Sequence, residues 1–199
     1  MAHRLLLNEV RPKYPPLAQI NYIHGHVRLL VTVACDGRVK SIHVLRGHPF
    51  LALAALKAIR RWVYRPFMTR SGPAEFQTMV DVNFSLVSPN LENFPPQPDK
   101  FVARAVQPPR VRHKAARPAA AGAVARLRVL VDKKGHVVDS TLLSGTPAEF
   151  TAAKKVVARW NFQPARWGNL SVPWYADVNV PVQSSLRSRG PEQAVPWLR

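Results

Sequence analysis

The sequence predicts an α+β fold in which one small unit occurs twice. Residues 27–67 align with residues 125–165 without a gap, and 15 of the 41 aligned pairs are identical. In each copy, stretches in which apolar and polar residues alternate, as in strands, flank one stretch with the 3.6-residue period of a helix. We therefore expect two small domains, each a three-stranded antiparallel sheet packed by helices in the order α-β-β-α-β.

A Pro-rich stretch with few large apolar residues separates the two copies, and it predicts an extended linker. The expected organisation is an N-terminal segment (1–9), a first domain (10–88), a linker (89–121), a second, degenerate domain (122–183) and an irregular tail (184–199).

Composition limits the classes of protein to which the chain can belong. Apolar residues make up 47% of the 199 residues, which is enough for a buried core. The single cysteine, Cys35, excludes an internal disulfide framework. The longest apolar runs, such as 51–56, are far shorter than the roughly 20 residues that cross a bilayer, and the first residues do not resemble an export signal. The net charge of +18 favours anionic partners but says nothing about the fold.

In the first copy, residues 27–34 alternate between apolar and polar, as in a half-buried strand. Asp36-Gly37 then predicts a hairpin turn, because Gly adopts a positive φ without steric cost. Pro49 suits the first turn of a helix, and Trp62 ends its apolar stripe, which makes Trp62 a core anchor rather than a ligand platform. The other expected elements are a short helix at 15–20, a second strand at 39–45, a helix at 50–62 and a third strand at 75–86.

The second copy predicts strands at 124–132, 136–143 and 172–182 and a helix at 147–160. Asp81-Val82-Asn83 and Asp177-Val178-Asn179 are identical, which suggests that the loop before the third strand is shorter by two residues. Pro118 interrupts the segment 113–122, where the leading helix of the first copy would have its equivalent.

Residues 14–86 resemble the C-terminal domain of TonB-family energy transducers. The matching motifs follow the family's order: Tyr14-Pro15-x-x-Ala18-Gln19, Ile23-x-Gly25-x-Val27, Asp36-Gly37-Arg38-Val39, Arg60-Arg61-Trp62-x-Tyr64-x-Pro66 and Asp81-Val82-Asn83-Phe84. The second copy resembles the same domain from about residue 122 to 183 but lacks the opening motif.

The resemblance implies a periplasmic binding module that is not an enzyme. Such domains capture the TonB box, a short peptide of TonB-dependent outer-membrane receptors, as an added strand. They couple its capture to the proton-driven motor ExbB–ExbD, and this drives the uptake of siderophores and other cargo. Members of the family carry an N-terminal anchor helix, so we expect the periplasmic face of the envelope if an anchor or signal precedes this sequence, and the cytoplasm otherwise.

The expected partner-binding residues form two groups. The resemblance implies the first group through the segment that contains Gln19, together with its neighbours Ile20 and Tyr22. Strand addition uses the main chain of an edge strand and its alternating side chains, which indicates the second group on the third strand: Gln77, Met79, Asp81 and Asn83.

Proline content predicts that the first copy binds peptide better than the second. No proline occurs from Glu75 to Val87, whereas Pro173 and Pro181 lie in the matching strand and lack N–H donors on one edge. The alternative is that these two prolines only cap the strand ends. An exposed edge also leaves a homodimer open.

Other functions find less support in the sequence. A soluble basic protein that binds nucleic acid or an anionic surface on the same scaffold is the alternative that the charge of +18 suggests. We do not expect nucleic acid as a partner, because no RNP-like aromatic pair and no Gly-x-x-Gly clamp occurs. His24-x-His26 provides two ligands without a nearby third, so we expect no metal. No nucleophile motif and no cofactor motif is found, and we expect neither catalysis nor a cofactor.

Overall fold

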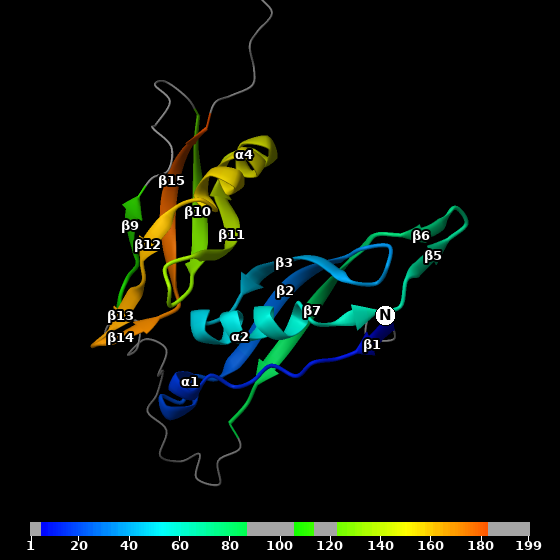
Figure 1. Cartoon of the computed structure of the whole chain (residues 1–199), viewed down its shortest axis with the longest axis horizontal. Helices are drawn as coiled ribbons and strands as arrows, with labels where there is room; N and C mark the ends of the chain where they lie inside the picture. The colour runs from blue at the N-terminus through cyan, green and yellow to red at the C-terminus, as the bar shows by residue number, and fades with distance from the viewer. Residues whose placement is uncertain (1–4, 87–105, 114–122, 183–199) are drawn as a thin grey trace, which may run out of the picture.

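Two three-stranded antiparallel sheets form the framework of the chain, with strand orders β3-β2-β7 and β11-β10-β15 (Figure 1). The computed structural model describes residues 5–86, 106–113 and 123–182. We call residues 5–86 the first half and the other described residues the second half. One longer helix packs on each sheet, so the chain has the predicted α+β class.

The elements of the first half are β1 (Leu6–Asn8), α1 (Pro16–Ile20), β2 (Gly25–Val33), β3 (Val39–Arg46), α2 (Pro49–Ile59), β4 (Val63–Tyr64), β5 (Phe67–Thr69), β6 (Gly72–Ala74) and β7 (Phe76–Phe84). Those of the second half are β8 (Val106–Gln107), β9 (Arg110–His113), β10 (Ala123–Val131), β11 (Val137–Ser144), α4 (Pro147–Val157), β12 (Asn161–Gln163), β13 (Ala165–Trp167), β14 (Leu170–Val172) and β15 (Trp174–Val182). The strands and helices expected in the described residues are present, with ends within about three residues of their expected positions.

The prediction that the loop before the last strand of the second copy is shorter by two residues is wrong. Arg28 pairs with Asp81 across β2 and β7, and Arg126 pairs with Asn179 across β10 and β15. Asn179 is therefore the counterpart of Asp81, and the offset of 98 holds through the last strand. Because side chains alternate with a period of two, a shift of two leaves the buried face unchanged, so the sequence pattern could not distinguish the two alignments.

Short strands outside the predicted elements extend both halves. The segment 106–113, which we assigned to the linker, forms β8 and β9, which pair with β13 and β12. Similarly, β1 lies in the expected N-terminal segment and pairs with β4. Strands of two to four residues are too short to show a period, which is why the sequence did not reveal them. The rest of the linker, the interrupted segment 114–122 and the whole expected tail (184–199) lie outside the described residues.

The turn between β2 and β3 and the turn between β10 and β11 each contain a glycine that allows a later segment of the chain to pass close by. Gly37 has a φ of +83°, and a Cβ there would overlap the carbonyl oxygen of Tyr64. The two residues are this close because Tyr64 N–H donates to the carbonyl of Gly37 at 2.8 Å. Gly135 and Phe162 repeat this arrangement, with a φ of +91° and a hydrogen bond of 3.0 Å. The glycine of each turn therefore marks a close chain crossing as well as a turn.

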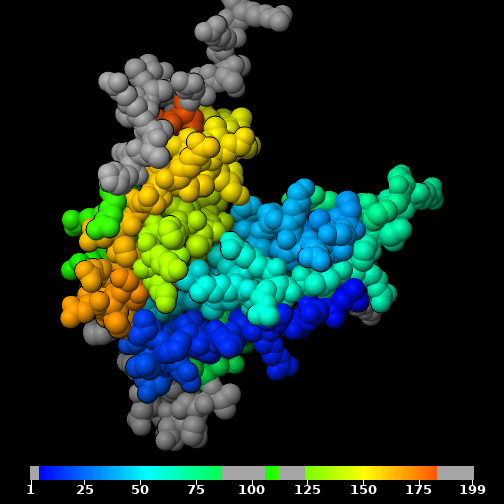
Figure 2. Space-filling view, in the orientation of Figure 1, coloured from blue at the N-terminus to red at the C-terminus, as the bar shows by residue number. Residues whose placement is uncertain are grey.

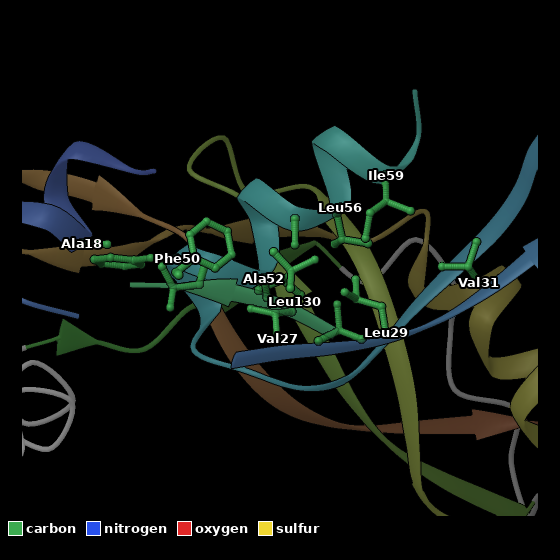
Figure 3. Close-up of a cluster of buried hydrophobic side chains, with 14 of the residues drawn as sticks. Ala18, Val27, Leu29, Val31, Phe50, Ala52, Leu56, Ile59 and Leu130 are labelled. Atoms are coloured by element: carbon green, nitrogen blue, oxygen red, sulfur yellow. The ribbon is translucent and has the colours of Figure 1, made fainter. Parts of the chain in front are cut away.

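The two halves share one hydrophobic core centred on α2. Leu130 and Val172 of the second half belong to the same buried cluster as Leu29 and Leu56 of the first half. Figure 3 shows Leu130 among the side chains of α2 and β2. At the N-terminal end of α2, the ring centroids of Phe50 and Trp174 lie 6.1 Å apart. The second half also has a separate core cluster of its own.

The second half also covers the outer edge of β3. Asp139 of β11 is buried and accepts the Val44 N–H at 2.7 Å through one carboxylate oxygen, and its other oxygen lies 3.2 Å from His43 Nδ1. The hydroxyl of Thr141 donates to the Val44 carbonyl at 3.3 Å. Side chains of β11 therefore satisfy the main-chain groups that an additional strand would otherwise bind.

We predict that Gly37→Ala lowers the free energy of unfolding by about 3 kcal/mol, because it combines a strained φ with backbone overlap. The matched control is Gly168→Ala, where φ is +57° but no atom lies near the added Cβ; it should cost about 1 kcal/mol. Urea denaturation of the full chain measures both. Equal losses would contradict the role of the close crossing.

We also predict that Asp139→Ala lowers the free energy of unfolding by about 1–3 kcal/mol, because it leaves the Val44 N–H buried without an acceptor. Ser41 occupies the corresponding position of the first half and serves as the control. Ser41→Ala should change stability by no more than about 0.5 kcal/mol. The same denaturation assay compares them, and a neutral Asp139→Ala would show that β11 does not stabilise the β3 edge.

Candidate functional site

The outer side of β7 is an open sheet edge, because β7 pairs only with β2 among the described strands. Ala34 N–H donates to the Arg38 carbonyl at 2.9 Å in the β2–β3 turn, so odd-numbered residues of β2 direct their main-chain groups toward β7. The even-numbered residues of β7 lie opposite them and are bonded, as with Val80 opposite Leu29. The odd-numbered residues of β7 therefore direct their N–H and C=O groups outward: Gln77, Met79, Asp81 and Asn83.

A groove of about 530 Å³ runs along this edge. The strand contributes residues 78–83, and the facing wall consists of Leu6 and the segment 9–12 together with Trp62 and Tyr64. Six strand residues extend about 17 Å, which is long enough for a docked segment of five or six residues. The groove thus lies beside unpaired main-chain groups, which is the geometry that strand addition requires.

The four predicted residues of β7 contribute in different ways. The side chain of Met79 is 65% exposed and offers a flexible apolar contact. Asp81 is engaged instead, because Arg28 binds its carboxylate with two hydrogen bonds of 2.8 and 3.2 Å. This pairing holds the pKa of Asp81 below its usual value, so the carboxylate stays ionised and paired at neutral pH. Asp81 is therefore available to a partner mainly through its main chain.

Gln19, Ile20 and Tyr22 lie outside the groove lining. All three side chains are exposed, on α1 and the turn after it, and Tyr22 has a φ of +54°. Their segment leads into β2, whose first residue, Gly25, pairs with Phe84 at the end of β7. The structure thus places this group beyond one end of the edge, and it brings only the second group together on the groove.

The facing wall contains residues that sequence reasoning did not select. Arg11 and Pro12 come from a segment without any periodic pattern, so no signal in the sequence indicated them. Trp62 is buried, as predicted, and its indole N–H donates to the Val10 carbonyl at 2.9 Å, which holds this segment against the helix end. Burial raises the pKa of Tyr64 to about 12, so its phenol is neutral at physiological pH.

The corresponding edge of the second half carries one proline inside the strand. In the β10–β11 turn, Asp132 N–H donates to the His136 carbonyl at 2.9 Å, and the same alternation then directs Pro181 outward. Pro181 is the counterpart of Asn83, so the edge of β15 lacks a donor where β7 has one. Pro173 precedes the first residue of β15 and caps its start.

No cluster of three or more potential metal ligands occurs among the described residues. In the same residues, no helix has the length and apolar character needed to cross a membrane.

Comparisons with known proteins find a family match in the first half. Residues 10–86 match the family model described as the Gram-negative bacterial TonB protein C-terminal domain. Among solved structures, the solution structure of the Pseudomonas aeruginosa TonB C-terminal domain is similar at 26% identity and a TM-score of 0.37, over 42% of this chain and 86% of that one. A comparison with curated proteins returns no match. Residues 10–86 of this chain therefore match the TonB C-terminal family.

Proposed function

We propose that the first half captures the TonB box of outer-membrane receptors by strand addition at β7. The observation that carries this proposal is the row of outward main-chain groups on Gln77, Met79, Asp81 and Asn83 beside a groove of about 530 Å³. An added strand would exchange hydrogen bonds with these groups, which provide affinity, while its alternating side chains provide specificity.

The lining of the groove indicates the chemistry of the docked segment. On the groove side, Val80 is partly exposed and offers apolar surface, whereas Val82 and Trp62 are buried behind it. Glu9 and Arg11 add charged groups to the facing wall. On the opposite face, Met79 is exposed beside the Arg28–Asp81 ion pair. A segment with apolar side chains on one face and small or polar side chains on the other would fit both environments.

As part of the same proposal, the domain acts in the periplasm and transmits force from the motor ExbB–ExbD to receptors that transport siderophores or similar cargo. The family assignment of residues 10–86 supports this role.

Replacement of Asn83 by Pro tests the open edge. Asn83→Pro removes one outward N–H and leaves the bonds to β2 intact, and the second half already has Pro181 at this position. We expect a labelled TonB-box peptide to bind the full chain about three- to tenfold more weakly, because one main-chain hydrogen bond contributes about 1 kcal/mol. Fluorescence anisotropy measures the dissociation constant.

Asn83→Ala is the matched control, since it removes the side chain and retains the N–H donor. It should change affinity by less than about twofold. If Asn83→Ala and Asn83→Pro weaken binding equally, the main-chain edge is not the docking site. If affinity instead falls steeply with salt for any anionic probe, the alternative of a basic surface binder is favoured.

A further inference from the structure

A second groove lies where the two halves meet, and it is distinct from the β7 edge. It has a volume of about 540 Å³ and lies between the segment 10–17, one face of α2, and residues 133 and 173 of the second half. Figure 2 shows these three regions meeting on one face of the molecule: the blue N-terminal segment, cyan α2 and the yellow-green turn between β10 and β11. The first half supplies most of the lining, and the second half completes it with Lys133 and Pro173.

The lining of this junction groove is apolar. Its floor consists of Phe50 and Leu53 of α2, and Tyr14 and Leu17 lie on the facing side. Leu53 is only partly buried, so apolar surface remains accessible in the groove. The corresponding helix of the second half has Ala148 and Thr151 in place of Phe50 and Leu53, which means that this surface is particular to α2.

Positive charge surrounds the apolar floor. The lining contains five cations and no carboxylate: Arg11, Lys13, Lys57, Arg61 and Lys133. All five are exposed, and none forms an ion pair with a carboxylate in the part of the chain that the structure describes. Like charges gathered in this way repel one another and attract an anionic ligand.

The positive region continues on the other side of Leu53. An adjoining groove of about 340 Å³ shares Lys57 and Lys133 and adds Arg60 and Lys134. Its single carboxylate, Asp132, accepts the main-chain N–H groups of Lys134 and His136 at 2.8 and 2.9 Å. Both N–H groups bind Oδ1, and Oδ2 lies 3.8 Å from His136 Nδ1, so among the described residues Asp132 pairs with none of the neighbouring lysines and arginines.

We infer that the junction groove binds an extended acidic peptide segment that also carries apolar side chains. The apolar floor would accept the apolar side chains, and the rim of cations would pair with Asp and Glu. The concave shape favours a peptide over a membrane surface, because the apolar residues line a hollow and do not project outward as in an interfacial anchor. This inference concerns a second binding site and does not depend on strand addition at β7.

The test measures binding of a fluorescein-labelled peptide of alternating Glu and Leu to the full chain by fluorescence anisotropy. The variant Lys57→Gln/Arg61→Gln/Lys133→Gln should weaken binding at least about tenfold, because three exposed charge pairs are lost. The control variant Lys155→Gln/Arg159→Gln/Arg70→Gln removes the same net charge. Lys155 on α4 and Arg159 just after its end are the counterparts of Lys57 and Arg61, and all three control residues are exposed. Its affinity should stay within about twofold of the unmodified chain.

Two further measurements separate the groove from a general field of positive charge. A peptide of alternating Glu and Ser should bind at least about tenfold more weakly than the Glu-Leu peptide, because it lacks apolar side chains. Because an alternating Glu-Leu peptide also has the pattern proposed for the β7 edge, the triple variant and its control are measured in the Asn83→Pro background as well. The triple variant should weaken binding at least about tenfold there too, which separates this site from the β7 edge. Circular dichroism melting verifies that each variant is folded.

Three results would overturn the inference. The first is an equal loss of affinity in the control variant, and the second is equal affinity for the Glu-Ser and Glu-Leu peptides. The third is strong binding to phosphatidylglycerol vesicles, lost in the Lys57/Arg61/Lys133 variant, without binding of the Glu-Leu peptide. That third outcome would assign the surface to anionic lipid.

Discussion

The packing of α2 between the two halves is the constraint on which the rest of the structure depends. A helix that covers one sheet needs one apolar face, but α2 also contacts the second half through Phe50 and the ring of Trp174. Its counterpart α4 has Lys154 where α2 has Leu56, and far fewer of its residues are buried. Because a unit of about 75 residues has a marginal core, sharing one core enlarges the buried volume available to the first half.

Because of this shared packing, the second half covers one edge of the first sheet and leaves the other edge open. Asp139 and Thr141 satisfy Val44 on β3 with side-chain atoms, so the second half covers that edge without adding a strand to it. β7 forms the other edge of the sheet, and no described strand of the second half pairs with it. One edge of the first sheet is thereby left open, and a further groove lies where residues of both halves meet.

Comparison of the two sheets shows how the second half became suited to this packing. On the solvent-facing side of the first sheet, Arg28 pairs with Asp81. In the second sheet, Arg128 pairs with Asp177, and these residues correspond to Leu30 and Met79 of the first sheet. The ion pair therefore lies two residues further along the strands than in the first sheet. The pair of Leu130 and Tyr175 occupies the end nearest the first half, and the Tyr175 hydroxyl donates to the Gly47 carbonyl at 3.2 Å. A surface that is polar in one sheet is thus a contact surface in the other.

The sequence by itself determined the local structure and the family resemblance of the first half, since alternation, the Asp-Gly turn and the motifs around Trp62 act over short distances along the chain. It also indicated the outward residues of β7, because edge strands alternate with a period of two. Only the tertiary structure decided the register of β15, the capping of the β3 edge by Asp139, and the wall of the groove that contains Arg11. These features depend on contacts between residues far apart in the sequence, and a period of two is unchanged by a shift of two, so no local pattern could specify them.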